Sequence, residues 1–123
     1  MSAYQDKDGV LIMDQLLARI KKLEYHQKLL LNMIHGEGFE FDRLIVVNNL
    51  DQNEVEEFLK MCEDLNKEML EQKAEKFIFY APLFAEFKHR LTPKLDHREV
   101  IEACLRQQIY PELMEKLKRN ILD

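Results

Sequence analysis

The sequence predicts an all-α fold, a compact multihelical bundle of about five helices with a long amphipathic helix near the N-terminus. Composition is the first reason, because the 123 residues include only 3 glycines and 3 prolines while 33% are charged. Periodicity is the second, because apolar residues recur at alternating steps of three and four over residues 13–34. The third is a pair of helix-start motifs, LDQNEV and LDHREV. A β fold would need more turn residues.

Residues 1–9 are polar and end in Gly9, so we expect a flexible tail before the first helix. The 46% of hydrophobic residues suffice for one core, and we expect residues 10–123 to form a single helical domain. Cys62 and Cys104 have no CxxC spacing, which is typical of free thiols in a reducing cytoplasm. No stretch approaches the roughly 18 apolar residues of a membrane span or has the pattern of a signal peptide. We therefore expect a cytoplasmic protein with no membrane partner.

The first helix is expected to run from about Val10 to His35 and to end at Gly36, since glycine tolerates the left-handed turn that closes helices. Its apolar residues form one continuous face, interrupted once by an amide. We call this face the seam; its residues are Met13, Leu16, Ile20, Leu23, Gln27, Leu30 and Ile34. In heptad terms the seam occupies the a and d positions. Arg19 at g and Glu24 at the next e are spaced to pair between parallel chains.

Two interpretations of the seam remain open. An ordinary core helix would have a similar face, since three heptads make a short coiled coil and Leu17 and Leu31 widen the apolar stripe. Length favours self-association, because about 24 residues at about 1.5 Å each span about 36 Å, close to the width of such a domain. Burying half a dozen large aliphatic side chains is worth on the order of 10 kcal/mol before entropy costs. We predict a homo-oligomer, in particular a dimer, whose interface is the seam and whose register Gln27 sets.

Residues 39–47 contain a β-branched run that fits either a short buried strand or a helix. We expect a short helix capped by Asp42, because a lone strand would have no partner for its backbone groups. Residues 77–84 are so apolar that we expect them at the centre of the core, with Pro82 either kinking a helix or beginning one.

The remaining helices have clearer starts. Asp51 and Asp96 are each expected to cap a helix, with a glutamate three residues later that can reach back. The helix after Asp51 should bury one face, and a last helix should begin at Pro111. The residues expected to be buried on these two helices are Val55, Phe58, Leu59, Cys62, Leu65 and Met69, then Leu113, Leu117 and Ile121.

Three patterns with possible chemistry each have a simpler explanation. Glu86 and His89 have the Glu-x-x-His spacing of helical di-iron proteins, but the sequence contains one copy, which fits an exposed polar face. His26 could carry a phosphoryl group in a helical dimer, although Gln27 replaces the acidic neighbour usual in such helices. The cysteines lie on apolar stripes, as packed thiols do. We therefore assign no catalytic residue, no cofactor and no metal site.

A DNA-binding regulator is the alternative functional class. LTP at residues 91–93 precedes a capped helix, as in helix-turn-helix proteins, and basic residues are frequent in the last third of the chain. These are Lys88, Arg90, Lys94, Arg98, Arg106, Lys116, Lys118 and Arg119. However, four glutamates interrupt this set, the net charge is −5, and Arg106, Gln107 and Gln108 come only at the helix end. The sequence thus disfavours nucleic acid as a partner.

Two segments, MDQLLARIKKLEYHQKLLLNMI and FDRLIVVNNLDQNEVEEF, carry a family resemblance. On these the chain resembles the YhaI-like proteins, a family of small all-helical proteins of unknown function from Bacillus-type bacteria. The resemblance covers nearly the whole chain, implies an all-helical fold and assigns no functional residue. The sequence as a whole predicts a non-enzymatic, self-associating interaction or regulatory module, with an unidentified protein as a further partner.

Overall fold

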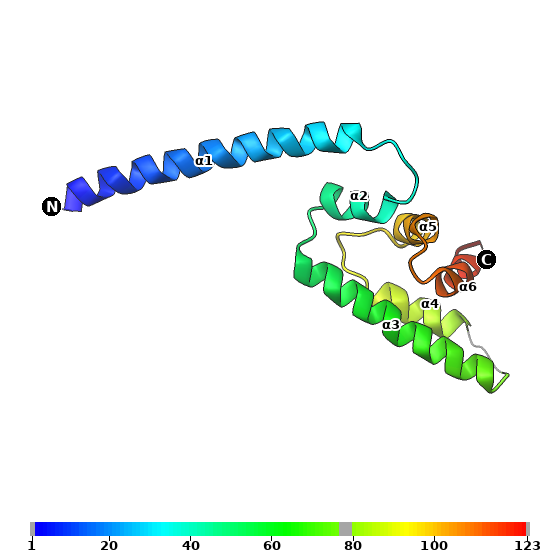
Figure 1. Ribbon diagram of the computed structural model, residues 1–123. Helices are drawn as coiled ribbons and strands as arrows, with labels where there is room; N and C mark the ends of the chain where they lie inside the picture. The colour runs from blue at the N-terminus through cyan, green and yellow to red at the C-terminus, as the bar shows by residue number, and fades with distance from the viewer. Residues whose placement is uncertain (1, 77–79, 123) are drawn as a thin grey trace. The chain divides into compact units, whose positions relative to one another are not determined.

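The computed structural model describes residues 2–76 and 80–122 (Figure 1). Within these ranges the chain forms six helices and no strand: α1 (Ser2–Met33), α2 (Glu40–Val47), α3 (Gln52–Ala74), α4 (Tyr80–Arg90), α5 (His97–Gln107) and α6 (Pro111–Leu122). This confirms the all-α class, with six helices where the sequence predicts about five. The chain divides into two units, Met1–His35 and Gly36–Asp123. The first unit contains α1, and the second contains α2 to α6.

Both ends of α1 differ from the expected ends. The helix begins at Ser2, before the expected start near Val10, and its last residue is Met33. The glycine with a left-handed backbone is Gly38, with φ of 98°, and not the expected Gly36. A side chain at residue 38 would be strained in this conformation, so the turn between α1 and α2 depends on that glycine.

The segment over residues 39–47 is a helix, as expected, but its cap differs from the prediction. Phe39 is the N-cap residue of α2 and makes no side-chain cap hydrogen bond, while Asp42 lies inside the helix. The acceptor comes from α5, where Gln107 Oε1 accepts hydrogen bonds from the backbone N–H groups of Phe41 (2.8 Å) and Asp42 (3.1 Å). Gln107 Nε2 also donates to the Asp42 carboxylate at 3.0 Å. The side chain of Gln107 therefore takes the capping role expected of Asp42 and also hydrogen-bonds to the Asp42 carboxylate.

The two aspartate caps are confirmed. At the start of α3 the Asp51 carboxylate accepts from the Glu54 N–H at 2.8 Å, and Glu54 accepts from the Asp51 N–H at 3.0 Å. At the start of α5 Asp96 accepts from the Glu99 N–H at 3.1 Å. Both starts use side-chain acceptors for the first-turn N–H groups that an α-helix leaves without partners.

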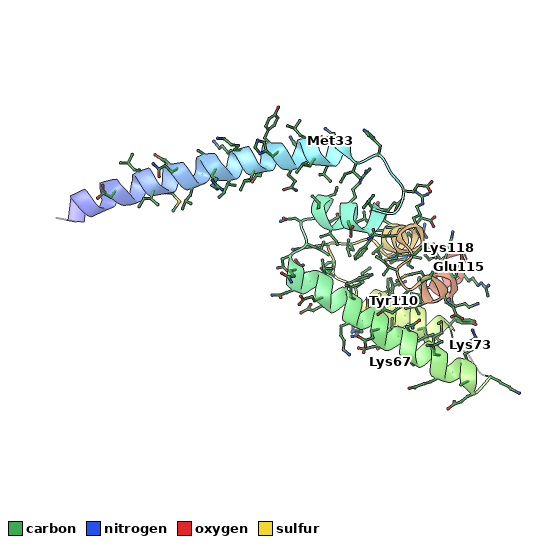
Figure 2. All side chains as sticks on the ribbon, in the orientation of Figure 1. Met33, Lys67, Lys73, Tyr110, Glu115 and Lys118 are labelled. Carbon is green, nitrogen blue, oxygen red and sulfur yellow. The ribbon has the colours of Figure 1, made fainter. Side chains whose placement is uncertain are left out.

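All five helices of the second unit contribute to one core. α6 contacts α3, α4 and α5, while α2 packs on α5 and α3 packs on α4. Lys73 in the last turn of α3 also pairs with Glu112 of α6 at 2.6 Å (Figure 2). The largest side chains with under 2% exposure are Leu65, Met69, Leu83, Phe87, Ile101, Leu113, Met114 and Leu117.

The expected core residues are mostly buried. On α3, Leu59 is 37% exposed and Val55 is only partly buried, while Met61, which the sequence did not single out, is buried. Pro82 lies within α4, near the first described residue of that helix, Tyr80. Of the apolar segment at residues 77–84, Leu83 is buried and Phe84 packs partly buried against the core, while residues 77–79 lie outside the described residues.

Candidate interaction surface

The seam predicted from the heptads lies on α1, with Ile34 directly after the last helical residue. Its apolar side chains are between 37% exposed at Ile34 and 60% exposed at Leu30, and Gln27 is exposed among them. Met33 lies near the C-terminal end of α1 (Figure 2). The core side chains of the second unit, by contrast, are at most 7% exposed.

The seam is exposed because the first unit contains few structural elements. It contains a single helix, so no second element within that unit covers the seam. One helix buries a leucine side chain only in part, against neighbours three and four residues away. Contiguous exposed apolar patches of more than a few hundred Å² mark interaction sites in proteins. The seam can therefore bind the apolar face of another helix.

Gln27 is the one seam residue that can form strong hydrogen bonds through its side chain. Within the seam it lies between Leu23 and Leu30. An amide carries two N–H donors and one carbonyl acceptor, so it needs a polar partner wherever the seam is covered. A polar residue at one a position is a common means of fixing the register of paired helices.

The other sequence candidates do not come together into a catalytic or metal site. His26 is exposed, with its ring 6.3 Å from that of Tyr25, and Glu86 pairs with Arg90 at 3.6 Å. Among the described residues no three or more histidines, cysteines, aspartates or glutamates are arranged to hold a metal ion.

Both cysteines are packed in the core at 0% exposure. Burial raises the pKa of the Cys62 thiol to about 12 and raises the pKa of the Cys104 thiol as well, with nearby Cys62 adding to the latter shift. Since the thiolate is the nucleophile, both side chains are inert at neutral pH. This agrees with the prediction that they pack in the core.

Several basic residues of the last third of the chain are paired with carboxylates. Lys94 contacts Glu54 at 2.9 Å, and Lys118 contacts Glu102 at 3.2 Å. Lys88 lies over the Phe84 ring, 5.1 Å from its centroid. A recognition helix would use an amide such as that of Gln107 to hydrogen-bond to a base. Here the amide of Gln107 already forms hydrogen bonds with α2.

Sequence reasoning missed the role of Gln107 and a groove in the second unit. The sequence near residue 39 gives no signal for Gln107, because Phe39 has no side-chain acceptor and the acceptor comes from α5. The groove has a volume of about 940 Å³ and lies between the first half of α3 and the end of α4. Phe58 and Met61 line it together with Glu57, His89 and Arg90, so charges of both signs surround an apolar floor.

Within the described residues, no helix is both long enough and apolar enough to cross a membrane. A family model matches residues 13–122, a range that includes the seam and α2 to α6. The family is described as a protein of unknown function, DUF1878. Because the match covers most of the sequence, the chain belongs to the DUF1878 family.

Proposed function

We propose that this protein is a non-enzymatic interaction or regulatory module of the cytoplasm that forms a homodimer through the seam. The observation that carries the proposal is the exposure of the seam, whose apolar side chains are all at least 37% exposed. A second copy supplies a matching apolar face by symmetry, since the same patch serves both subunits of a two-fold dimer. We also propose the finer assignment to the YhaI-like proteins of Bacillus-type bacteria.

The area of the seam supports a dimer. Burying one large aliphatic side chain removes on the order of 100 Å² from water, given its transfer free energy and about 25 cal/mol per Å². Two copies that each bury six apolar seam side chains therefore remove on the order of 1,000 Å². This reaches the lower limit for a specific protein interface. Leu17 and Leu31, beside the seam on the same face, add to that area.

The experiment compares two substitutions on opposite sides of α1. Leu23 is 54% exposed in the seam, and Tyr25 is 60% exposed on the other face, so the two positions have matched exposure and helix location. Sedimentation equilibrium at micromolar concentration should give a dimer for the wild type and for Tyr25→Asp. Leu23→Asp should give a monomer, because a carboxylate would be buried without a partner.

Circular dichroism should show that the second unit of Leu23→Asp remains helical and cooperatively folded. A wild-type monomer at these concentrations would refute the proposal. A dimer that Tyr25→Asp breaks and Leu23→Asp leaves intact would place the interface on the other face of α1.

A further inference from the structure

Resting on the proposed function, we propose that the two α1 helices of the dimer run parallel and in register, so that the Gln27 side chains of the two copies face each other. The heptad places Gln27 at an a position within the seam. In a parallel pair, a positions face a positions, whereas in an antiparallel pair they face d positions. The orientation therefore decides which side chain meets the amide of Gln27.

Parallel pairing gives Gln27 a partner that can satisfy it. One amide donates an N–H to the carbonyl oxygen of the other, and the symmetry of the pair allows this in either direction. In the two antiparallel registers that match six of the seven seam residues, Gln27 lies opposite Leu16 or Leu23 of the second copy. The amide would then be buried against a leucine without a hydrogen-bond partner, a costly arrangement.

The charges beside the seam favour the same orientation. Arg19 occupies a g position and Glu24 the following e position, and in a parallel coiled coil a g residue lies beside the e residue five positions later on the other chain. Each copy then contributes one Arg19 and one Glu24 to two equivalent ion pairs. In an antiparallel pair, g lies beside g and e beside e, so these opposite charges are separated.

Parallel pairing has a consequence for the second unit. Each α1 continues at its C-terminal end into residues 36–123 of its own chain, so both copies of the second unit follow from the same end of the helix pair. A dimer of this kind carries two identical folded units, both connected to the same end of the helix pair. A partner with two binding sites would gain avidity from such a dimer.

Disulfide trapping tests the orientation. Ile20→Cys is mixed in equal amounts with Leu23→Cys, and separately with Leu30→Cys, so that all variants keep Gln27, and each mixture is oxidised with glutathione disulfide. The native cysteines do not interfere, since both are fully buried. A parallel, in-register dimer should give 20–20, 23–23 and 30–30 disulfides, and an antiparallel dimer should give 20–23 or 20–30 disulfides, which mass spectrometry separates. Tyr25→Cys, on the opposite face of α1, is the matched control and should form a mixed disulfide with glutathione but no disulfide between two protein chains.

The outcomes distinguish this inference from the proposed function. A dimer by native mass that forms 20–23 or 20–30 disulfides, or none at residue 20, overturns the parallel register while leaving self-association intact. A monomer by native mass refutes the proposed function itself. Liposome binding by monomeric α1 would identify a lipid surface as the occupant of the seam and would also overturn the inference.

A charge exchange gives a second, independent readout. Arg19→Glu should weaken the dimer by about twofold to tenfold, because two exposed ion pairs become repulsive. Adding Glu24→Arg in the same chain should restore the wild-type affinity, since each g position is again opposite in charge to the facing e position. Failure of the double variant to recover would contradict the parallel arrangement.

Discussion

The two units of this protein use the same kinds of side chain in opposite ways. Leu23 of α1 is 54% exposed, whereas Leu117 of α6 is 1% exposed. Each lies on the apolar stripe of an amphipathic helix, so the stripe alone does not determine burial. What differs is the number of helices within the unit: five in the second and one in the first, counted over the described residues. The five helices of the second unit cover one another's apolar stripes, whereas no second helix within the first unit covers the stripe of α1.

This comparison predicts that the two regions respond to different variables. The stability of the second unit should depend on its own packing and not on protein concentration. If α1 is covered by a second copy, its stability should rise with concentration, because association adds a free energy set by mass action.

Phe87→Ala should lower the free energy of unfolding of the second unit by about 3 to 5 kcal/mol, the usual cost of truncating a buried aromatic side chain. Phe87 is 0% exposed and packs edge-on against Phe58 with ring centroids 6.2 Å apart. Urea denaturation followed by circular dichroism measures the change. Leu23→Ala is the control and should leave this transition unchanged; if both variants shift it equally, the contrast between the units fails.

Gln27→Ile should tighten self-association by roughly tenfold or more, about 1.4 kcal/mol, because an apolar side chain replaces an amide that must be desolvated. It should also loosen the choice of orientation and oligomer size, since a single polar a residue fixes the register. Sedimentation velocity over a concentration series reports both effects. An unchanged or weaker association would mean that Gln27 is not covered in the dimer.

Gln107→Ala should destabilise the second unit by about 1 to 2 kcal/mol, the range for loss of a helix cap. Hydrogen exchange should become faster at the N–H groups of Phe41 and Asp42, whose acceptor is Gln107. The matched control is Gln52→Ala, since Gln52 donates to Glu56 in an exposed pair and the loss of that hydrogen bond should cost less than about 0.5 kcal/mol. Protection at residue 41 that survives in Gln107→Ala would contradict the assigned cap.

The smallest expected effect concerns the loss of folding stability at acidic pH, which we call the acid limb. The backbone N–H of Asp51, and then Lys94, lower the pKa of Glu54 below its usual value. A lowered folded-state pKa contributes stability that is present above the unfolded pKa of about 4.3 and is lost as pH falls through the folded value. Glu54→Gln should flatten the loss of stability below about pH 4, as thermal melts can measure.

Lys94→Gln is the graded control for this prediction, because it removes the second cause of the Glu54 shift and keeps the first. It should flatten the acid limb less than Glu54→Gln does. Asp64 and Glu112 also have lowered pKa values, through hydrogen bonds with Lys60 and Lys73 respectively, so part of the limb should remain in both variants. Identical limbs in Glu54→Gln and the wild type would show that this carboxylate contributes nothing.

The sequence predicted those features of the fold that depend on neighbouring residues. Asp51 and Asp96 cap their helices because the acceptor and the N–H group are three residues apart. Pro111 begins α6 for a similarly local reason, since proline lacks the N–H that a first turn leaves unpaired. The cap of α2 was wrong because its acceptor, Gln107, is 66 residues from Phe41. The sequence at residues 39–42 therefore cannot identify Gln107 as the acceptor.

The candidate interaction surface was predictable in its residues but not in its surroundings. Heptad spacing identifies Leu16, Leu23 and Leu30 as one face, because spacing fixes the angle around a helix axis. Whether another element covers that face depends on tertiary contacts, which periodicity does not encode. The groove between α3 and α4 was missed for the same reason, since Phe58 and His89 meet there from distant segments.

The Gln107 contact also orders events during synthesis on the ribosome. α2 is eight residues long, which is shorter than helices that are stable alone in water. Its first turn also donates hydrogen bonds to the side chain of Gln107, at the end of α5. The nascent chain therefore cannot complete α2 until residue 107 has emerged. α1, whose backbone hydrogen bonds are local, emerges whole well before that point. Any meeting of neighbouring nascent chains through α1 precedes the folding of the rest.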